Sequence, residues 1–391
     1  MDGREGRRVT PTPAPTGYQP PPYPQDRVAD LRTLAAATGH GVDLSIGDPC
    51  DPVPKVVADA LTGALGRGAN YPASVGFPEF REAASEWMNR RLAVSVELDA
   101  IAACVGTKEF VASLPRLLSL RAPERDTVLY PAIAYPTYAM GAELAGLRAV
   151  GVPFGADGHI DLSAVAPEDA ERALLLWLNE PGNPTGSVAD ASWFSGAVAW
   201  ARRHGVIVAS DECYVEFTFD GEPPATALGA GSEGVLAVHS LSKRSNMAGL
   251  RAGFVAGDPD LVRYLGEMRK HLGLMVPGPV QIAAAAAWRD DEHVTRQRAI
   301  YRERREAFLE ALDGSGVTHD GGPGTFYLWL ADAAGRDAWT VADEFARAGI
   351  VVAPGDLFGE DRARHVRVAL VAPSEILAPA LSRLPSVLRA G

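Results

Sequence analysis

The chain has 391 residues, of which 47% are hydrophobic, and these are enough for one large domain with a smaller companion. Its formal net charge of -12 argues against general affinity for nucleic acids, and no apolar run approaches the ~20 residues of a membrane-spanning helix. The three cysteines are scattered singly, which fits neither a disulfide framework nor a zinc site, and the N-terminus lacks a signal-peptide pattern. We therefore expect a cytoplasmic protein without a metal site.

The first elements in the chain are an arm, a short helix and a loop. Residues 1–25 are rich in proline, so they predict an extended or disordered arm that could order against a partner subunit. A helical pattern over Arg27–Ala37 follows. Val42–Pro54 then passes from a strand-like run into a proline-rich loop that begins at Gly47. This loop is either a plain turn or a segment that runs close to a ligand.

From Lys55 to about Pro279, helical stretches such as Ala191–Arg203 alternate with short apolar runs. This alternation predicts an α/β fold with a largely parallel sheet covered by helices on both faces. Ligands bind beyond the carboxyl ends of such strands, so functional residues are expected just after each one. The predicted strands are Thr127–Tyr130, Ala173–Leu178, Val206–Ser210, Val235–His239 and Gly253–Ala256.

After Pro279 a long helical stretch leads into a smaller α+β region. We predict a large domain over residues 46–279 and a small domain formed by residues 26–45 and 280–391. The elements expected in the small domain are strands at Thr325–Leu330, Gly349–Ala353 and His365–Val371, a helix at Trp339–Ala348 and a terminal helix.

The stretch Val235–Gly253 carries the strongest chemical signal. Its strand ends in Ser240, Ser242 and Lys243, and Arg251 follows. Hydroxyls and a guanidinium can bind a phosphate while a lysine condenses with an aldehyde, a combination that suits pyridoxal phosphate. A polar loop with solvated charges is the alternative.

Two other strand ends carry side chains that would suit the same cofactor. Asp211, after Val206–Ser210, could pair with a protonated pyridine nitrogen or cap a helix. Asn183, in the turn-rich LNEPGNPTG, and Tyr214 could both hydrogen-bond a ring hydroxyl. For Asn183 an ordinary Asn-Pro turn is the alternative.

Further candidates are weaker when each is taken alone. Thr107 and Lys108 precede a helical run and would suit a phosphate or form an ordinary cap. Tyr135 could stack on a flat ring or pack in the core. Arg367 alternates with apolar residues, so it could clamp a carboxylate or lie on the surface. Gly229–Gly234 matches G-x-G-x-x-G, but a strand follows it instead of a helix, which argues against a nicotinamide oxidoreductase.

In this order and spacing, these motifs resemble the class I/II aminotransferases of pyridoxal-phosphate fold type I, over nearly all of the chain after the arm. The resemblance implies that Lys243 forms the Schiff base, that Asp211 holds the pyridinium and that Tyr135 stacks on the ring. It implies that Asn183 and Tyr214 bind the ring hydroxyl, and that Gly47, Asn183 and Arg367 bind substrate. The expected phosphate ligands are Thr107, Lys108, Ser240, Ser242, Arg251 and, from a neighbouring subunit of a homodimer, Tyr71.

Phrases such as GDPCDPVP, DECYVEF and VHSLSKRSNMAGLRAGFVAGD are most similar to N-succinyl-LL-diaminopimelate aminotransferases of lysine biosynthesis. That resemblance implies 2-oxoglutarate and glutamate as the exchanging pair. The alternatives are another amino acid, a C–S β-lyase on the same fold, or a non-catalytic regulator. Lys270, Arg244 and Arg269 are basic residues near recognised motifs that could bind the distal succinyl group, but we expect solvated surface charges.

Overall fold

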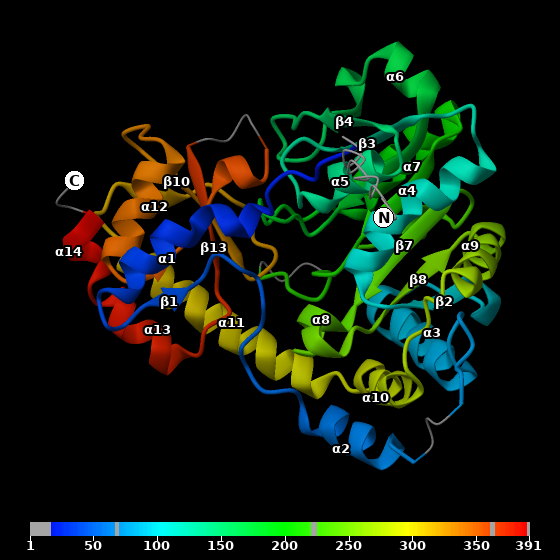
Figure 1. The fold of residues 1–391 in the computed structure, drawn as a ribbon, viewed down its shortest axis with the longest axis horizontal. Coiled ribbons are helices and arrows are strands. Elements are labelled where there is room, and N and C mark those ends of the chain that lie inside the picture. The colour runs from blue at the N-terminus through cyan, green and yellow to red at the C-terminus, as the bar shows by residue number, and fades with distance from the viewer. Residues whose placement is uncertain (1–16, 67–69, 220–224, 360–363, 389–391) are drawn as a thin grey trace, which may run out of the picture.

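The computed structural model describes residues 17–66, 70–219, 225–359 and 364–388. Two lobes lie side by side in Figure 1: a large lobe built around a wide sheet, and a small lobe that holds the C-terminal strands. Helix α11 (Glu292–Ala311) runs between them. No helix in these ranges is long and apolar enough to cross a membrane.

Within the described ranges, the sheet of the large lobe has seven strands in the order β2-β8-β7-β6-β5-β3-β4. All neighbouring pairs are parallel except those that involve β8, which is antiparallel to both β2 and β7. The prediction of a largely parallel sheet is confirmed. The strands are β2 (Ile101–Cys104), β3 (Thr127–Pro131), β4 (Arg148–Val152), β5 (Ala173–Asn179), β6 (Ile207–Asp211), β7 (Val235–Ser240) and β8 (Gly253–Gly257).

Helices cover both faces of this sheet because its strands are apolar on both sides. Along β5, Leu175 packs with α4, α5 and α9, whereas its neighbour Leu176 packs with α3, α7 and α10. Helix α7 begins where Asp190 caps Trp193 N–H and ends at Gly205, whose φ is +63°. The helices are α2 (Lys55–Ala64), α3 (Pro78–Leu92), α4 (Thr107–Arg121), α5 (Thr137–Leu144), α6 (Pro167–Arg172), α7 (Ala191–His204), α8 (Leu241–Arg244), α9 (Pro259–His271) and α10 (Gly278–Arg289).

The reversed direction of β8 determines which segments meet at one sheet edge. Gly253, the first residue of β8, pairs with Ser240 at the end of β7 and with Cys104 at the end of β2. The segment before β8 therefore lies beside the segments that follow β2, β6 and β7.

The small lobe has its own apolar core around a sheet that, among the described residues, has four strands in the order β12-β13-β10-β9, and β1 pairs with β11 in parallel. Its elements are α1 (Ala29–Ala36), β1 (Val42–Asp43), β9 (Val317–His319), β10 (Tyr327–Asp332), α12 (Ala338–Arg347), β11 (Ile350–Val351), β12 (Ala353–Pro354), β13 (His365–Ala369), α13 (Ser374–Leu381) and α14 (Leu384–Leu388).

Two predicted strands of the small lobe need correction. Gly349–Ala353 is not one strand: β11 joins β1, whereas β12 joins β13, so the chain changes sheet at Val352. The strand predicted at Thr325 begins at Tyr327, because Thr325 has a φ of +64°, outside the β region.

Gly229–Gly234 begins within a short 3-10 helix over Ala227–Ala230 and ends directly before β7. The strand–loop–helix order of a dinucleotide site is absent from this described segment.

Candidate active site

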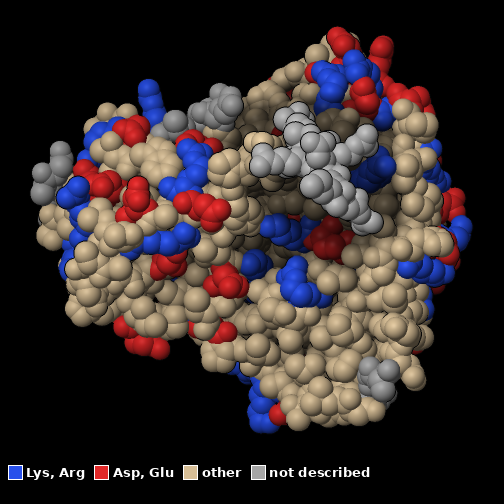
Figure 2. Space-filling model, viewed as in Figure 1, with Lys and Arg blue, Asp and Glu red and all other residues tan. Residues whose placement is uncertain are grey.

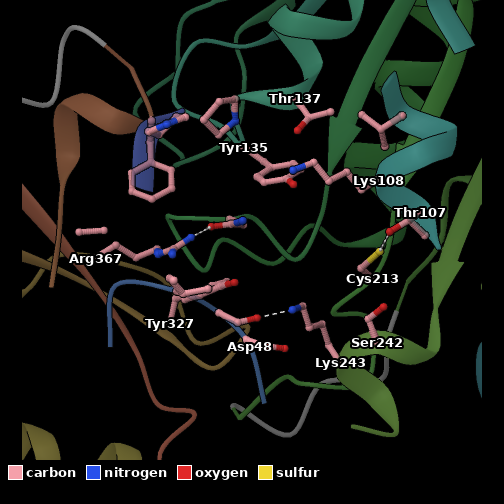
Figure 3. Close-up of a pocket in the computed structure, with 18 of the residues that line it drawn as sticks. Asp48, Thr107, Lys108, Tyr135, Thr137, Cys213, Ser242, Lys243, Tyr327 and Arg367 are labelled. Carbon is pink, nitrogen blue, oxygen red and sulfur yellow. Dashed lines mark hydrogen bonds between the residues drawn. The ribbon is translucent and has the colours of Figure 1, made fainter. Parts of the chain in front are cut away.

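A pocket of about 470 Å³ lies between the lobes, at the carboxyl end of the large sheet. Figure 2 shows this hollow with basic side chains inside it. In Figure 3 Arg367 enters from strand β13 of the small sheet, whereas Lys243 and Thr107 enter from helices α8 and α4 of the large lobe. The predicted residues that line the pocket are Gly47, Thr107, Lys108, Tyr135, Asn183, Asp211, Tyr214, Ser240, Ser242, Lys243, Arg251 and Arg367.

Lys243 lies in α8, the short helix that directly follows β7. Ser240 begins this helix by accepting a hydrogen bond from Ser242 N–H. The Lys243 ammonium donates to the carbonyl of Gly47, in the predicted ligand loop. Burial lowers the pKa of Lys243 from the usual 10.5 to about 8, although the charge of Asp48 opposes this shift. The site thus makes the neutral amine accessible near physiological pH.

Asp211 ends β6 and is buried at the base of the pocket. Tyr138 of α5 donates to its Oδ2 over 2.9 Å, and Cys213 N–H donates to Oδ1 over 3.2 Å. Burial raises the pKa of Asp211, and within the described ranges no lysine or arginine forms an ion pair with it. A buried carboxylate without a cation fits a ligand that brings a positively charged N–H.

The start of α4 and Arg251 form a cradle that suits a phosphate. Gly106, which precedes α4, has a φ of +72° and gives the helix no side-chain cap. A Cβ on Gly106 would lie 2.0 Å from Nη2 of Arg251, so only glycine lets the guanidinium approach the helix start. Arg251 Nη1 donates to the Ala248 carbonyl over 2.8 Å. The uncapped amide groups and this cation together favour an anion.

Arg367 is 5% exposed, so the alternative of a surface arginine is wrong. Its Nη1 donates to Asn183 Oδ1 over 2.9 Å, and its Nη2 donates to the Ser45 carbonyl over 2.6 Å. The guanidinium carbon lies 4.2 Å from the ring centre of Tyr327 and 4.5 Å from that of Phe358. Aromatic rings and two hydrogen bonds therefore fix Arg367 before any ligand binds.

The polar groups around Asn183 and Tyr214 form two sets of hydrogen bonds. Asn179, the last residue of β5, donates to the Asp211 carbonyl over 3.1 Å and accepts from Asn183 N–H over 2.9 Å. The hydroxyls of Tyr214 and Tyr327 are 2.9 Å apart. Sequence reasoning missed Asn179 and Tyr327. Asn179 carried a usable signal, as a polar residue at the end of an apolar strand.

The Lys108 side chain points toward Tyr23, whereas the predicted role was to bind the phosphate. Its ammonium donates to the Tyr23 hydroxyl over 2.7 Å and lies 5.9 Å from the ring centre of Tyr135. Burial is the largest single influence and lowers the pKa of Lys108, but the contacts with Tyr23 and Tyr135 together outweigh it and raise this pKa, so the residue is a cation. Tyr23 belongs to the predicted arm, whose residues 1–16 lie outside the described ranges.

The three basic residues considered for a distal group do not line the pocket. Lys270 is half exposed and pairs with Glu267. Arg244 and Arg269 are not solvated as expected, because each is buried in an ion pair, with Glu216 and Glu109 respectively. Tyr71 is 96% exposed and does not line the pocket of its own chain either.

Comparison with known proteins identifies the family. The family model of class I and II aminotransferases matches residues 39–384. The transaminase OxyQ of Streptomyces rimosus, named for 4-dedimethylamino-4-oxo-anhydrotetracycline, is 41% identical and is matched over 93% of this chain and 99% of its own length. An LL-diaminopimelate aminotransferase of Desulforudis audaxviator is 37% identical, over 93% of this chain and 95% of its own.

A solved structure agrees with these relatives. A probable N-succinyldiaminopimelate aminotransferase from Thermus thermophilus superposes with a TM-score of 0.84 at 32% identity, covering 93% of this chain and 99% of that one. The chain therefore belongs to the class I and II aminotransferases, a family of enzymes that depend on pyridoxal phosphate.

Proposed function

We propose that the enzyme exchanges an amino group between N-succinyl-LL-2,6-diaminopimelate and 2-oxoglutarate, a step of lysine biosynthesis. One observation supports this choice: two cations, Arg367 and Lys108, face the same pocket as Lys243. Both the proposed donor and glutamate carry a carboxylate at each end. Arg367 would take the α-carboxylate, with Gly47 and Asn183 beside it, and Lys108 would take the distal one.

The residues of the pocket fit pyridoxal phosphate, which when bound serves as an electron sink for the carbanion formed at the substrate α-carbon. Asp211 lacks a cation and would pair with the ring nitrogen. Tyr214 and Asn183 would bind the ring hydroxyl, and Tyr135 would stack on the ring. Thr107, Ser240, Ser242 and Arg251 would hold the phosphate around the cradle at Gly106.

In this proposal Lys243 carries the proton. Its lowered pKa makes the amine a base near neutral pH. The amine can therefore take the proton from the substrate α-carbon, hold it on Nζ and release it again later in the reaction. Arg367 fixes the carboxylate, so the α-carbon hydrogen is held toward Lys243. The buried walls around Asp211 and Tyr214 keep water away from the carbanion.

The pKa of Lys243 leads to a pH prediction. Below about 8 the ammonium predominates, and above it the amine predominates. The rate at which the cofactor-free chain captures pyridoxal phosphate covalently should therefore rise from pH 6 to 8 and then level off. Stopped-flow absorbance measures this rate. A rate that keeps rising toward pH 10.5, the usual lysine value, would contradict the lowered pKa.

A second substrate deserves a test because OxyQ is matched over almost its whole length. The pocket has aromatic walls at Tyr23, Tyr135, Tyr327 and Phe358, which would also suit a polycyclic ketone of the kind in that name.

We propose a panel of donors with 2-oxoglutarate: N-succinyl-diaminopimelate, LL-diaminopimelate, N-acetylornithine, aspartate, alanine and aromatic amino acids. The reverse assay would use glutamate and a tetracyclic ketone. Absence of activity on the first donor would reject the proposed substrate, and release of pyruvate and ammonia would indicate a β-lyase.

Lys108 gives a specificity prediction. Lys108→Met should lower kcat/KM for glutamate by about 5- to 30-fold, since the variant loses one partly exposed charge pair with the distal carboxylate. Activity with alanine, which has no distal carboxylate, should change less than about twofold. Steady-state assays with both donors measure the ratio. Equal losses for glutamate and alanine would contradict the distal role and favour the phosphate role first expected for Lys108.

We also propose a cytoplasmic homodimer in which Tyr71 reaches the phosphate of the neighbouring subunit. Tyr71 is 96% exposed and does not line the pocket of its own chain, so its side chain is open to a neighbouring subunit. Light scattering tests the dimer. Mixing inactive Lys243→Ala chains with Tyr71→Phe chains tests the shared site, because the mixed dimer should regain one intact active site.

A further inference from the structure

Tyr327 contacts three residues that line the pocket: Tyr214, Arg367 and Gly47. It is 3% exposed, and it comes from β10 of the small lobe, next to β13, which carries Arg367. Its hydroxyl lies 2.9 Å from that of Tyr214, and its ring lies 4.2 Å from the Arg367 guanidinium. A Cβ on Gly47 would lie 1.9 Å from the Tyr327 hydroxyl. In Figure 3 the Tyr327 side chain lies between Arg367 and Lys243.

We propose that Tyr327 is a positioning residue that couples the carboxylate site to the cofactor site, donating its hydroxyl proton to Tyr214 and supporting Arg367 with its ring. This inference rests on the proposed role of Tyr214 as a donor to the ring hydroxyl oxygen of the cofactor.

The direction of the hydrogen bond follows from counting protons. A phenol has one proton, and it can accept as well as donate. If Tyr214 gives its proton to the cofactor oxygen, the bond between the two hydroxyls must be donated by Tyr327. Burial raises the pKa of both phenols, so each keeps its proton at neutral pH. Hydrogen bonds in such a chain polarise and strengthen one another.

The ring of Tyr327 has a separate task. Arg367 is held between this ring and that of Phe358, so the planar guanidinium cannot tilt away from the substrate carboxylate. The Arg367 Nε atom is buried and has no hydrogen-bond partner among the described residues. Its N–H is therefore free to meet a carboxylate when one enters.

The two tasks can be separated by two substitutions. Tyr327→Phe removes the hydroxyl and keeps the ring, whereas Tyr327→Leu removes both. Tyr301→Phe is a matched control, because Tyr301 is a buried tyrosine of the same lobe whose hydroxyl has no partner in the described part of the chain.

The first readout is the pH at which the absorbance of the bound cofactor changes in the absence of substrate. The ring oxygen of the cofactor shares a proton with the nitrogen of Lys243. A hydrogen bond donated to this oxygen makes the oxygen hold that proton less strongly, so losing the donor should raise the titration pKa. We expect Tyr214→Phe to raise it by about 1 to 2 units, as for a hydrogen bond to a charged group. Tyr327→Phe should raise it by roughly 10–30% of that, because it acts one hydrogen bond away. The double variant Tyr214→Phe/Tyr327→Phe should show the same titration pKa as Tyr214→Phe alone.

The second readout is KM for glutamate. Tyr327→Phe should leave it within about twofold, while Tyr327→Leu should raise it by roughly 5- to 30-fold through loss of the cation–π contact. If Tyr214→Phe shifts the titration and Tyr327→Phe does not, the coupling is refuted and the role of Tyr214 stands. If Tyr214→Phe causes no shift, the proposed cofactor placement fails as well. If the Tyr301→Phe control shifts the titration pKa as much as Tyr327→Phe does, the coupling is also refuted.

Discussion

Lys243→Ala should abolish amino transfer, with kcat falling by about 10⁴-fold or more. The variant loses the proposed proton carrier, and general acid–base catalysis alone contributes up to about that factor. It also loses the amine that would hold the cofactor covalently. The measurement is a coupled assay for glutamate formation on protein reconstituted with pyridoxal phosphate.

Two further measurements separate a chemical role of Lys243 from a structural one. Borohydride reduction should fix the cofactor to the native chain and not to the variant, and mass spectrometry of the peptide that contains residue 243 would show the difference. Lys270→Ala is the matched control, because that lysine is half exposed on α9 and pairs with Glu267, three residues before it. Normal turnover by Lys243→Ala would refute the mechanism.

Much of the pocket was predictable because its residues follow buried strands. Asn183, Asp211 and Lys243 each come just after an apolar run, and the carboxyl ends of parallel strands meet at one edge. Arg251 was found for a weaker reason, its closeness to Lys243 in sequence. Its place depends on β8 running antiparallel, and an apolar run such as GFVAG does not indicate its own direction.

Apart from Asn179, which ends β5, the residues that sequence reasoning missed approach from elsewhere in the fold. Tyr138 lies on a helix that packs against the sheet, and Tyr327 belongs to the other lobe. Tyr23 comes from the proline-rich segment for which we predict an extended or disordered arm, and its hydroxyl accepts a hydrogen bond from Lys108. Aromatic residues in such places are ordinarily core or surface residues, and only tertiary packing shows that their hydroxyls reach polar partners.

Tertiary packing also explains why the prediction of solvated side chains for Arg244 and Arg269 is wrong. Their positive charges made solvent the default location, but Glu216 and Glu109 lie far from them in sequence and pair with them in the interior. A buried ion pair depends on both partners being brought together, which a single position cannot indicate. Arg367 was open to the same error, and its alternation with valines was the feature that indicated a strand facing the cleft.

Replacing Arg367 should have the second largest effect. Arg367→Met removes the charge that would bind the α-carboxylate and keeps an unbranched side chain between the two rings. We expect kcat/KM for glutamate to fall by about 10²- to 10³-fold, as when one partner of a desolvated charge pair is removed. Arg367→Lys should recover little, because an ammonium cannot make the paired, planar contacts of a guanidinium.

The substrate supplies the sharpest control for Arg367. A primary amine without a carboxylate gains nothing from this arginine, so its slow reaction should be the same in the native enzyme and in Arg367→Met. Arg347→Met, at an exposed arginine of α12 that pairs with Asp343, controls for loss of positive charge. Thermal unfolding of each variant shows whether the lobe is intact. If Arg367→Met loses activity equally with glutamate and with the simple amine, the arginine supports the fold of the pocket, and the α-carboxylate is bound elsewhere.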